Sequence, residues 1–392
     1  MKNICSVRNA AFSRACLAGV VAGLFPLAAA AGPTIPFGDQ GSLTFTYALQ
    51  GWVQHKGFTS ETDSGSAFDA FLRRNRLTFS GQYNDYVGFF AQLDAANDSK
   101  LGQDNKSVFY RDAYVTLDYR DDLRFIIGRF KNTFSRENLE ACLEPLTMDR
   151  AEVLSYTPFA GSRDTGAAVW GNLFDAKFQY RFMVADGREG DPVAKKNPRL
   201  TARVHYSFWD PEFNYGYLGT YLGTQKVLTI GASYDKQDSV AYGNFPARSD
   251  IKDYKAWTVD AFMEYPAQSG VYTLSGAAFK YDTGGAINMS PDPDLPVTSN
   301  LKGYYAKAGY MLPGKVGSGR LQFFARHEKS DYGLTTGYYD QKWNSAGANY
   351  YLDGQKLKVS FEYAKIAFNT QNPTNPALRD YNQATLGLQF IF

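Results

Sequence analysis

Apolar and polar residues alternate along most of the chain beyond residue 40, with the two-residue period of a β-strand. In 43–53, for example, Leu43 and Phe45 share one face, and Thr44 and Thr46 share the other. The same pattern recurs in fifteen further segments, at 70–83, 86–96, 108–119, 123–130, 164–171, 175–186, 199–209, 227–235, 255–265, 271–281, 302–312, 319–329, 343–352, 356–367 and 381–392. The sequence therefore predicts sixteen strands.

The connections between these strands alternate in length. Long segments follow the odd-numbered strands, at 54–69, 97–107, 131–163, 187–198, 236–254, 282–301, 330–342 and 368–380. Short ones mostly follow the even-numbered strands, at 84–85, 120–122, 172–173, 266–270 and 353–355. The exception is 210–226, where we expect either a small helix or an error in the placement of the strands. This two-sided asymmetry predicts a sixteen-stranded antiparallel transmembrane β-barrel, with short periplasmic turns and long external loops, and it is not expected of a soluble sandwich.

Composition agrees with a barrel. Aromatic residues make up 16% of the chain, with 28 Tyr and 29 Phe, while the mean hydropathy is −0.37. Barrels need aromatic girdles at both membrane interfaces, and their alternating strands keep the average hydropathy low. Most of the predicted strands have about nine to twelve residues, the length that a tilted strand needs to cross the hydrocarbon core.

The N-terminal 31 residues have the pattern of a secretory signal peptide. Lys2, Arg8 and Arg14 precede an apolar stretch at 15–27 and the small residues of 28–31. We expect cleavage near residues 30–32, which leaves 32–392 as the barrel. The net charge of +2 then becomes −1, so net charge indicates no selectivity, and Cys142 becomes the single cysteine.

The predicted last strand ends in Phe392, with Leu386 and Leu388 on the face of that residue. A final strand of this kind resembles the C-terminal signal that the outer-membrane assembly machinery recognises. Together with the signal peptide, it places the protein in the outer membrane of a Gram-negative bacterium, with outer-membrane lipid as its surroundings.

The lumen of a barrel of this size is a water-filled pore, and its polar lining tunes what passes. The polar faces of the strands carry these basic residues: Arg74, Arg76, Arg124, Lys177, Arg181, Arg203, Lys307, Arg320 and Arg326. They also carry these acids: Asp94, Asp112, Asp118, Asp260, Glu264, Glu328 and Glu362. Arginine suits phosphate and carboxylate groups, and rings of basic residues select anions. Alternatively, the basic residues pair with the acids and form a weakly selective wall.

The longest expected loop, 131–163, is rich in charged residues. Structureless loops of this length are usually functional, and in a porin it would fold inward and narrow the channel. Alternatively, it is a surface loop shaped by external partners.

Three segments carry a resemblance to a known family, namely Phe71–Gly81, Arg111–Val115 and Gly128–Glu137. They resemble the corresponding parts of the phosphate-selective porin O and P family. The resemblance implies a homotrimeric channel of sixteen strands for phosphate or similar small anions, with an inward-folded third loop. It also makes Arg74, Arg76, Arg129 and Lys131 the best candidates for pore-lining, anion-binding cations near the constriction.

Other functions find little support. His55, His205 and His327 are the only histidines, none has a partner at metal-ligand spacing, and no phosphate-cradling glycine loop occurs, so we expect no catalytic residue, metal or cofactor. No nucleic-acid partner is expected either. Two alternatives stay open: a barrel that sheaths or scaffolds a partner protein, and an enzyme with His327 at its rim.

Overall fold

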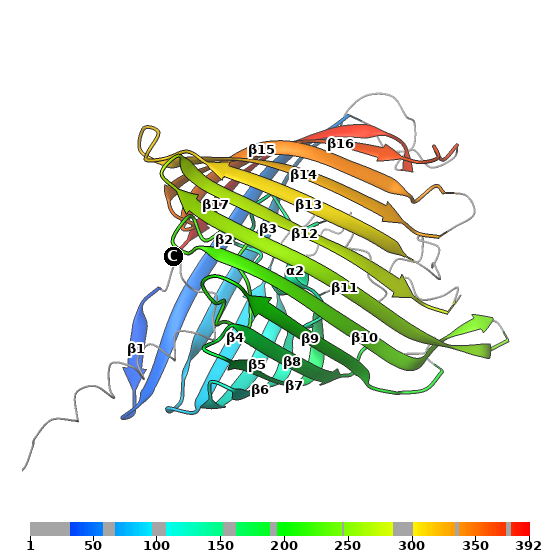
Figure 1. Ribbon diagram of the computed structural model, residues 1–392, viewed down its shortest axis with the longest axis horizontal. Coiled ribbons are helices and arrows are strands. Elements are labelled where there is room, and N and C mark those ends of the chain that lie inside the picture. Colours follow the sequence, from blue (N-terminus) through cyan, green and yellow to red (C-terminus); the bar gives the residue numbers. More distant parts are fainter. Residues whose placement is uncertain are drawn as a thin grey trace, which may run out of the picture.

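The strands form one closed ring (Figure 1). The structure, a computed structural model, describes residues 32–57, 67–95, 107–151, 162–188, 194–244, 247–284, 301–333, 337–373 and 378–392. The strands are β1 (Thr34–Phe37), β2 (Gly41–Lys56), β3 (Ala67–Gln82), β4 (Val87–Asp94), β5 (Phe109–Arg120), β6 (Leu123–Lys131), β7 (Arg163–Leu173), β8 (Phe178–Ala185), β9 (Arg199–Ser207), β10 (Val227–Asn244), β11 (Ser249–Ala267), β12 (Gly270–Asp282), β13 (Lys302–Met311), β14 (Arg320–Asp331), β15 (Gln341–Asp353), β16 (Leu357–Phe368) and β17 (Tyr381–Ile391). Each strand from β2 to β17 pairs antiparallel with its sequence neighbours, and β17 pairs with β2 to close the barrel.

All sixteen predicted strands are present, so the prediction of a sixteen-stranded antiparallel barrel is confirmed. The short strand β1 was missed. It pairs with the start of β2, and its four residues, which include Pro36, are too few to display a period.

The two faces of the strands differ as the alternation predicts. In β17, Thr385 and Gln389 are buried in the lumen, whereas Leu386 and Leu388 on the outer face are about half exposed. This arrangement suits a membrane, because the apolar outer face can meet lipid while the backbone groups of paired strands bond to one another around the ring.

The connections at the periplasmic end are tight. In the β3–β4 turn, the side chain of Asn84 accepts hydrogen bonds from the backbone N–H groups of Tyr86 and Val87, both at 2.9 Å. The β7–β8 turn has three successive residues with positive φ, Phe174 to Ala176. Such turns fix the register of each hairpin, and therefore which residues face the lumen.

One predicted external loop, 236–254, was wrong in its extent. β10 continues to Asn244 and β11 begins at Ser249, so the hairpin has a short connection and no long loop. The alternation is hard to see there because polar residues occupy both faces beyond the apolar stretch of the strands.

Several expected features lie wholly or partly outside the described residues. The expected signal peptide, residues 1–31, is one of them, and the external segments near 58–66, 96–106, 152–161 and 285–300 are others. In the part of the chain that the structure describes, the helix α2 (Arg136–Leu139) is far too short to cross a membrane, and no described helix is long and apolar enough to do so.

Candidate functional site

The segment that follows β6 crosses the lumen. Ser135 caps α2, with its Oγ accepting a hydrogen bond from the N–H of Asn138 at 3.0 Å. The next residue, Arg136, donates two hydrogen bonds of 2.7 Å to Glu212. On the opposite wall Lys307 donates to Glu137 at 2.5 Å. Charged contacts therefore hold α2 inside the barrel, where Figure 1 also shows it.

The far end of this segment is held by other strands. Asp149 accepts hydrogen bonds of 2.7 Å from both Arg73 and Arg74 of β3. The carbonyl of Leu146 accepts one of 2.8 Å from Asn349 of β15. Residues 132–151 thus lie against walls on several sides of the lumen.

The segment 208–226, the exception in the turn pattern, also enters the lumen. It contains no helix, and the strands on either side of it are placed as predicted. Its Tyr217 pairs with the first segment, because its N–H donates to Leu139 at 3.3 Å and its carbonyl accepts from Ala141 at 2.8 Å. The Tyr217 hydroxyl lies 2.6 Å from both Arg181 and His205 of the barrel wall. We call 132–151 and 208–226 together the lumen crosspiece.

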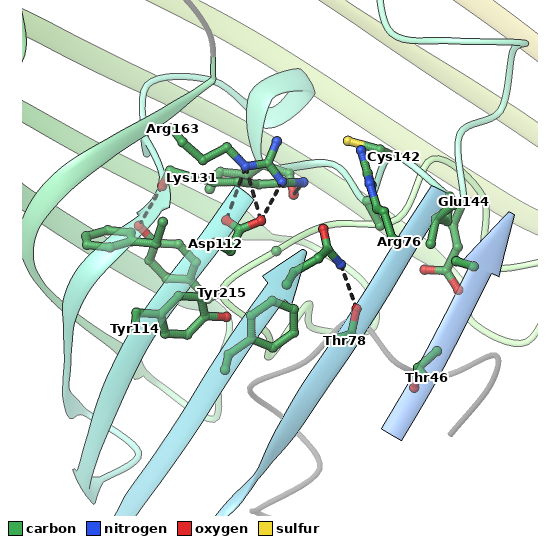
Figure 2. Close-up of a pocket in the computed structure, with 18 of the residues that line it drawn as sticks. Thr46, Arg76, Thr78, Asp112, Tyr114, Lys131, Cys142, Glu144, Arg163 and Tyr215 are labelled. Atoms are coloured by element: carbon green, nitrogen blue, oxygen red, sulfur yellow. Dashed lines mark hydrogen bonds and ion pairs between the residues drawn. The ribbon is translucent and has the colours of Figure 1, made fainter. Parts of the chain in front are cut away.

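A cavity of about 140 Å³ remains between the crosspiece and the wall formed by β2 to β7 (Figure 2). Thr46, Thr78 and Gln92 line its wall side. Cys142 and Glu144 line its crosspiece side. Figure 2 shows Arg76 beside Cys142, and Arg163 directed at Asp112.

Seven basic side chains gather at or next to this cavity, and we call them the basic arc: Arg73, Arg74, Arg76, Arg111, Lys131, Arg150 and Arg163. Three aspartates pair with members of the arc. Asp94 accepts hydrogen bonds from Arg76 at 2.9 Å and from Arg111 at 3.2 Å. Asp149 accepts hydrogen bonds from Arg73 and Arg74, and Asp112 accepts one from Arg163 at 3.0 Å. The arc is therefore positive in sum.

Two β-bulges add arginines to the arc. In β3, Gln50 pairs with Arg74 and Gly51 with Leu72, so Arg73 is an extra residue. In β5, Gln92 pairs with Asp112 and Leu93 with Tyr110, so Arg111 is extra. A bulge shifts the parity of a strand, and here each one directs an additional guanidinium to a lumen carboxylate.

Two carboxyl groups of the crosspiece have perturbed titration. Burial raises the pKa of Glu144 to about 7, against the opposing positive charges of Lys358 and Lys131. Burial, followed by the neighbouring charge of Glu137, raises the pKa of Glu140 to about 7. Both groups can therefore change charge near neutral pH.

Most of the predicted basic residues face the lumen and are paired. Arg203 donates to Asp260 at 2.6 and 2.8 Å, Arg326 donates to Glu362 at 2.8 Å, and Arg124 donates to Asp121 at 2.6 Å. Arg181 binds Tyr217 and the carbonyl of Tyr215. These residues mostly form the balanced wall that the sequence left as the alternative.

Apart from Arg129, the remaining predicted residues lie in two places. Arg74, Arg76 and Lys131 belong to the basic arc, and Lys131 donates to the carbonyls of Leu139 and Glu140. Lys177 and Arg320 lie at the periplasmic ends of their strands, bound to the carbonyls of Trp209 and Leu222.

The placement of Arg129 in the pore was wrong. It is exposed and shares the outer face of β6 with Phe125 and Ile127. The family resemblance suggested it, but the two-residue period directs it away from the lumen, as for every odd position from 125 to 129.

Sequence reasoning missed Arg73, Arg111 and Arg163 as pore residues. Bulges are not visible in a pattern of alternating residues, so the alternation could not have placed Arg73 and Arg111 in the lumen. Arg163 was included in the expected loop, although it is the first residue of β7.

No group of three or more His, Cys, Asp or Glu side chains suited to a metal occurs among the described residues. His327 faces outward, 3.2 Å from the hydroxyl of Tyr304 and 2.7 Å from Oδ1 of Asn344. Neither neighbour is the Ser or Asp that a hydrolase with His327 at its rim would be expected to use.

Residues 49–392 match the family described as phosphate-selective porin O and P. An uncharacterized protein of Aquifex aeolicus is 22% identical over 343 residues, which cover 78% of this chain and 77% of that protein. Among solved structures, the OmpF complex of Salmonella typhi with daunomycin has a TM-score of 0.60 at 16% identity, and covers 92% of this chain and 100% of its own.

Two further solved structures are similar. The anion-selective porin from Comamonas acidovorans has a TM-score of 0.57 at 12% identity, with 90% of this chain and 100% of that chain covered. The outer-membrane channel DcaP of Acinetobacter baumannii also has a TM-score of 0.57, at 14% identity, with 93% and 100% covered. At these identities the likeness shows the shared fold.

Proposed function

This chain belongs to the phosphate-selective porin O and P family and is an outer-membrane channel, and we propose that it passes small anions such as phosphate or similar oxyanions. The observation that carries the proposal is the basic arc, whose seven basic side chains outnumber the three aspartates paired with them. Fixed positive charge beside a narrow passage concentrates anions and repels cations.

The crosspiece is proposed as the constriction. It contacts walls on several sides of the lumen and leaves the cavity between itself and β2 to β7. A solute on this route meets Arg76, Lys131 and Arg163 at short range. Arginine can also donate two parallel hydrogen bonds to two oxygens of a carboxylate or an oxyanion, which favours these groups over chloride.

The proposal is tested by replacing two basic side chains whose removal leaves no acidic side chain without a basic partner. In the variant Arg74→Gln/Lys131→Gln, Asp149 keeps Arg73, and Lys131 binds only carbonyls. A unit charge about 8 Å from an ion in water contributes about half a kcal/mol, so the loss of two changes the energy of a passing anion by about 1 kcal/mol and should lower the anion-to-cation permeability ratio by about fivefold or more.

The matched control is Arg120→Gln/Arg129→Gln. It removes the same number of charges from the exposed end of β5 and from the outer face of β6. Its permeability ratio should equal that of the wild type. An unchanged ratio in the first variant would refute the assignment of the arc, whereas failure of the wild type to conduct would favour a barrel that sheaths a partner.

We also propose a homotrimer in the outer membrane, formed after a signal peptide is removed and after the assembly machinery recognises the strand that ends in Phe392. The strands β4, β6, β8 and β9 have only eight or nine residues, and this side of the barrel presents apolar outer residues such as Ile127 and Val184, which suits a subunit contact. Cross-linking in outer-membrane vesicles followed by mass determination tests this, and a monomer only would contradict it.

A further inference from the structure

Cys142 lies on the wall of the cavity, at the middle of the crosspiece. It is a free cysteine, only 4% exposed, and it lines the same space as Arg76 and Arg163. Figure 2 shows its sulfur beside the guanidinium of Arg76. Ion passage does not require a thiol at this place, so Cys142 can have a chemical role of its own.

The surroundings favour the thiolate. Burial alone raises the pKa of the Cys142 thiol, but the charges of Arg150, Lys131, Arg76 and Arg74 outweigh burial and hold that pKa well below its ordinary value. The thiolate is the nucleophilic form of cysteine.

A second group in the cavity lacks a partner. Glu144 is 4% exposed and lines the cavity, and its Oε2 accepts no hydrogen bond from any residue that the structure describes. A buried carboxylate oxygen without a donor is costly, and it therefore indicates a ligand that brings a donor. An ammonium group would supply one.

The basic arc offers a binding place for a group of the opposite charge, a carboxylate. Arg76 uses Nε to bind Asp94, while its two terminal nitrogens donate to no other described residue. These two nitrogens can donate hydrogen bonds to a carboxylate that enters the cavity. Arg76 and Glu144 thus provide separate places for the carboxylate and the ammonium of one amino acid.

We propose that Cys142 forms a mixed disulfide with small amino-acid disulfides of the cystine class. The Sγ thiolate attacks one sulfur of the disulfide, which breaks the S–S bond and forms a bond from Sγ to that half. The other half leaves as a thiolate and takes a proton from water. The disulfide is the oxidant and is reduced, so no further reagent is needed. The bound half fills the cavity and places its carboxylate against Arg76, which lowers conductance.

The first test is mass spectrometry of the folded, purified chain without residues 1–31, which contain Cys5 and Cys16, after treatment with cystine at pH 7. One cysteinyl group should be added to the wild type and none to Cys142→Ser. Cystine should react about tenfold faster or more than cystamine, which carries only positive charges, because the basic arc repels the latter. No adduct on the folded protein, or equal rates for the two disulfides, would overturn the proposal.

The role of Glu144 is tested with Glu144→Gln. This variant should react about tenfold more slowly with cystine, because a hydrogen bond to a charged group is lost. Its rate with dithiodipropionate, which has carboxylates and no ammonium, should not fall. Equal slowing with both reagents would refute recognition of the ammonium.

The consequence for transport is measured on single wild-type channels. Cystine should lower the conductance in one step, and a reducing agent should restore it. Formation of the adduct without any change in current would overturn the claim that it fills the passage. Because the adduct is detected by mass, its absence is distinguishable from a failure of the proposed anion selectivity.

Discussion

The ion pair between Arg136 and Glu212 joins the two halves of the crosspiece, and its loss should loosen them. Both side chains are 1% exposed, and two hydrogen bonds of 2.7 Å connect them. The Arg136 guanidinium also lies over the rings of Tyr217 and Phe262, at 4.5 and 3.9 Å from their centroids. Burial alone would raise the pKa of Glu212, but Arg136 lowers it below its ordinary value, so the carboxylate is charged at neutral pH.

Glu212→Gln removes one partner and leaves the buried Arg136 guanidinium without the carboxylate that it binds. Breaking a buried pair in this way costs about 3–5 kcal/mol. At about 1.4 kcal/mol for each factor of ten, the displaced state of the crosspiece becomes roughly a hundredfold more populated, or more. Single-channel recordings should then show frequent steps to a higher conductance, because displacement of the crosspiece widens the passage.

Two controls accompany this measurement. Asp122→Asn breaks an exposed pair with Arg120, which contributes about 0–1 kcal/mol, so its traces should match the wild type. Arg136→Met/Glu212→Leu removes both charges and should show fewer steps to a higher conductance than the single variant, since apolar replacement of a buried pair is often tolerated. If Glu212→Gln is as quiet as the wild type while its barrel remains folded, the ion pair does not hold the crosspiece.

Three further results are expected. Because Glu144 with its pKa of about 7 is neutral below that pH and negative above it, the anion-to-cation permeability ratio should fall between pH 6 and 8, and Glu144→Gln should reduce this dependence; an equally steep fall in that variant would contradict the assignment. Gly128→Ala should lower the thermal stability of the barrel in detergent by about 1–3 kcal/mol, because φ is +134° and a Cβ would lie 2.3 Å from the carbonyl oxygen of Ala113; an unchanged unfolding transition in gel mobility would refute this strain. Leu386→Arg places a charge on the lipid face at the middle of β17, at a cost of about 2–4 kcal/mol near the midplane, so less folded protein should be recovered from lipid vesicles, whereas an unchanged yield would argue against lipid at this face.

The sequence predicted the barrel well because lipid and water impose opposite demands on alternate residues. The same reasoning placed Arg74, Arg76 and Arg203 on the inward side of their strands, as the structure also does. The alternation misplaced no residue where it was followed. The errors came at Arg129, where the family resemblance was preferred to the alternation, and where a strand departs from a strict two-residue period.

The departures have physical causes. Arg73 and Arg111 are extra residues in bulges, and a bulge exchanges the two faces without changing composition. The inward course of 208–226 depends on contacts with distant parts of the chain, among them Tyr217 with Leu139 and Leu222 with Arg320 of β14. Such contacts exist only once the ring has closed, so a local pattern does not display them.

The most direct test of the central claim is the reversal potential of single wild-type channels in a salt gradient, measured before and after phosphate is added. The basic arc predicts a potential that reports anion preference, together with a fall in chloride current as phosphate occupies the arginines. Cation preference, or a chloride current that phosphate leaves unchanged at every concentration, would contradict a channel built for small oxyanions.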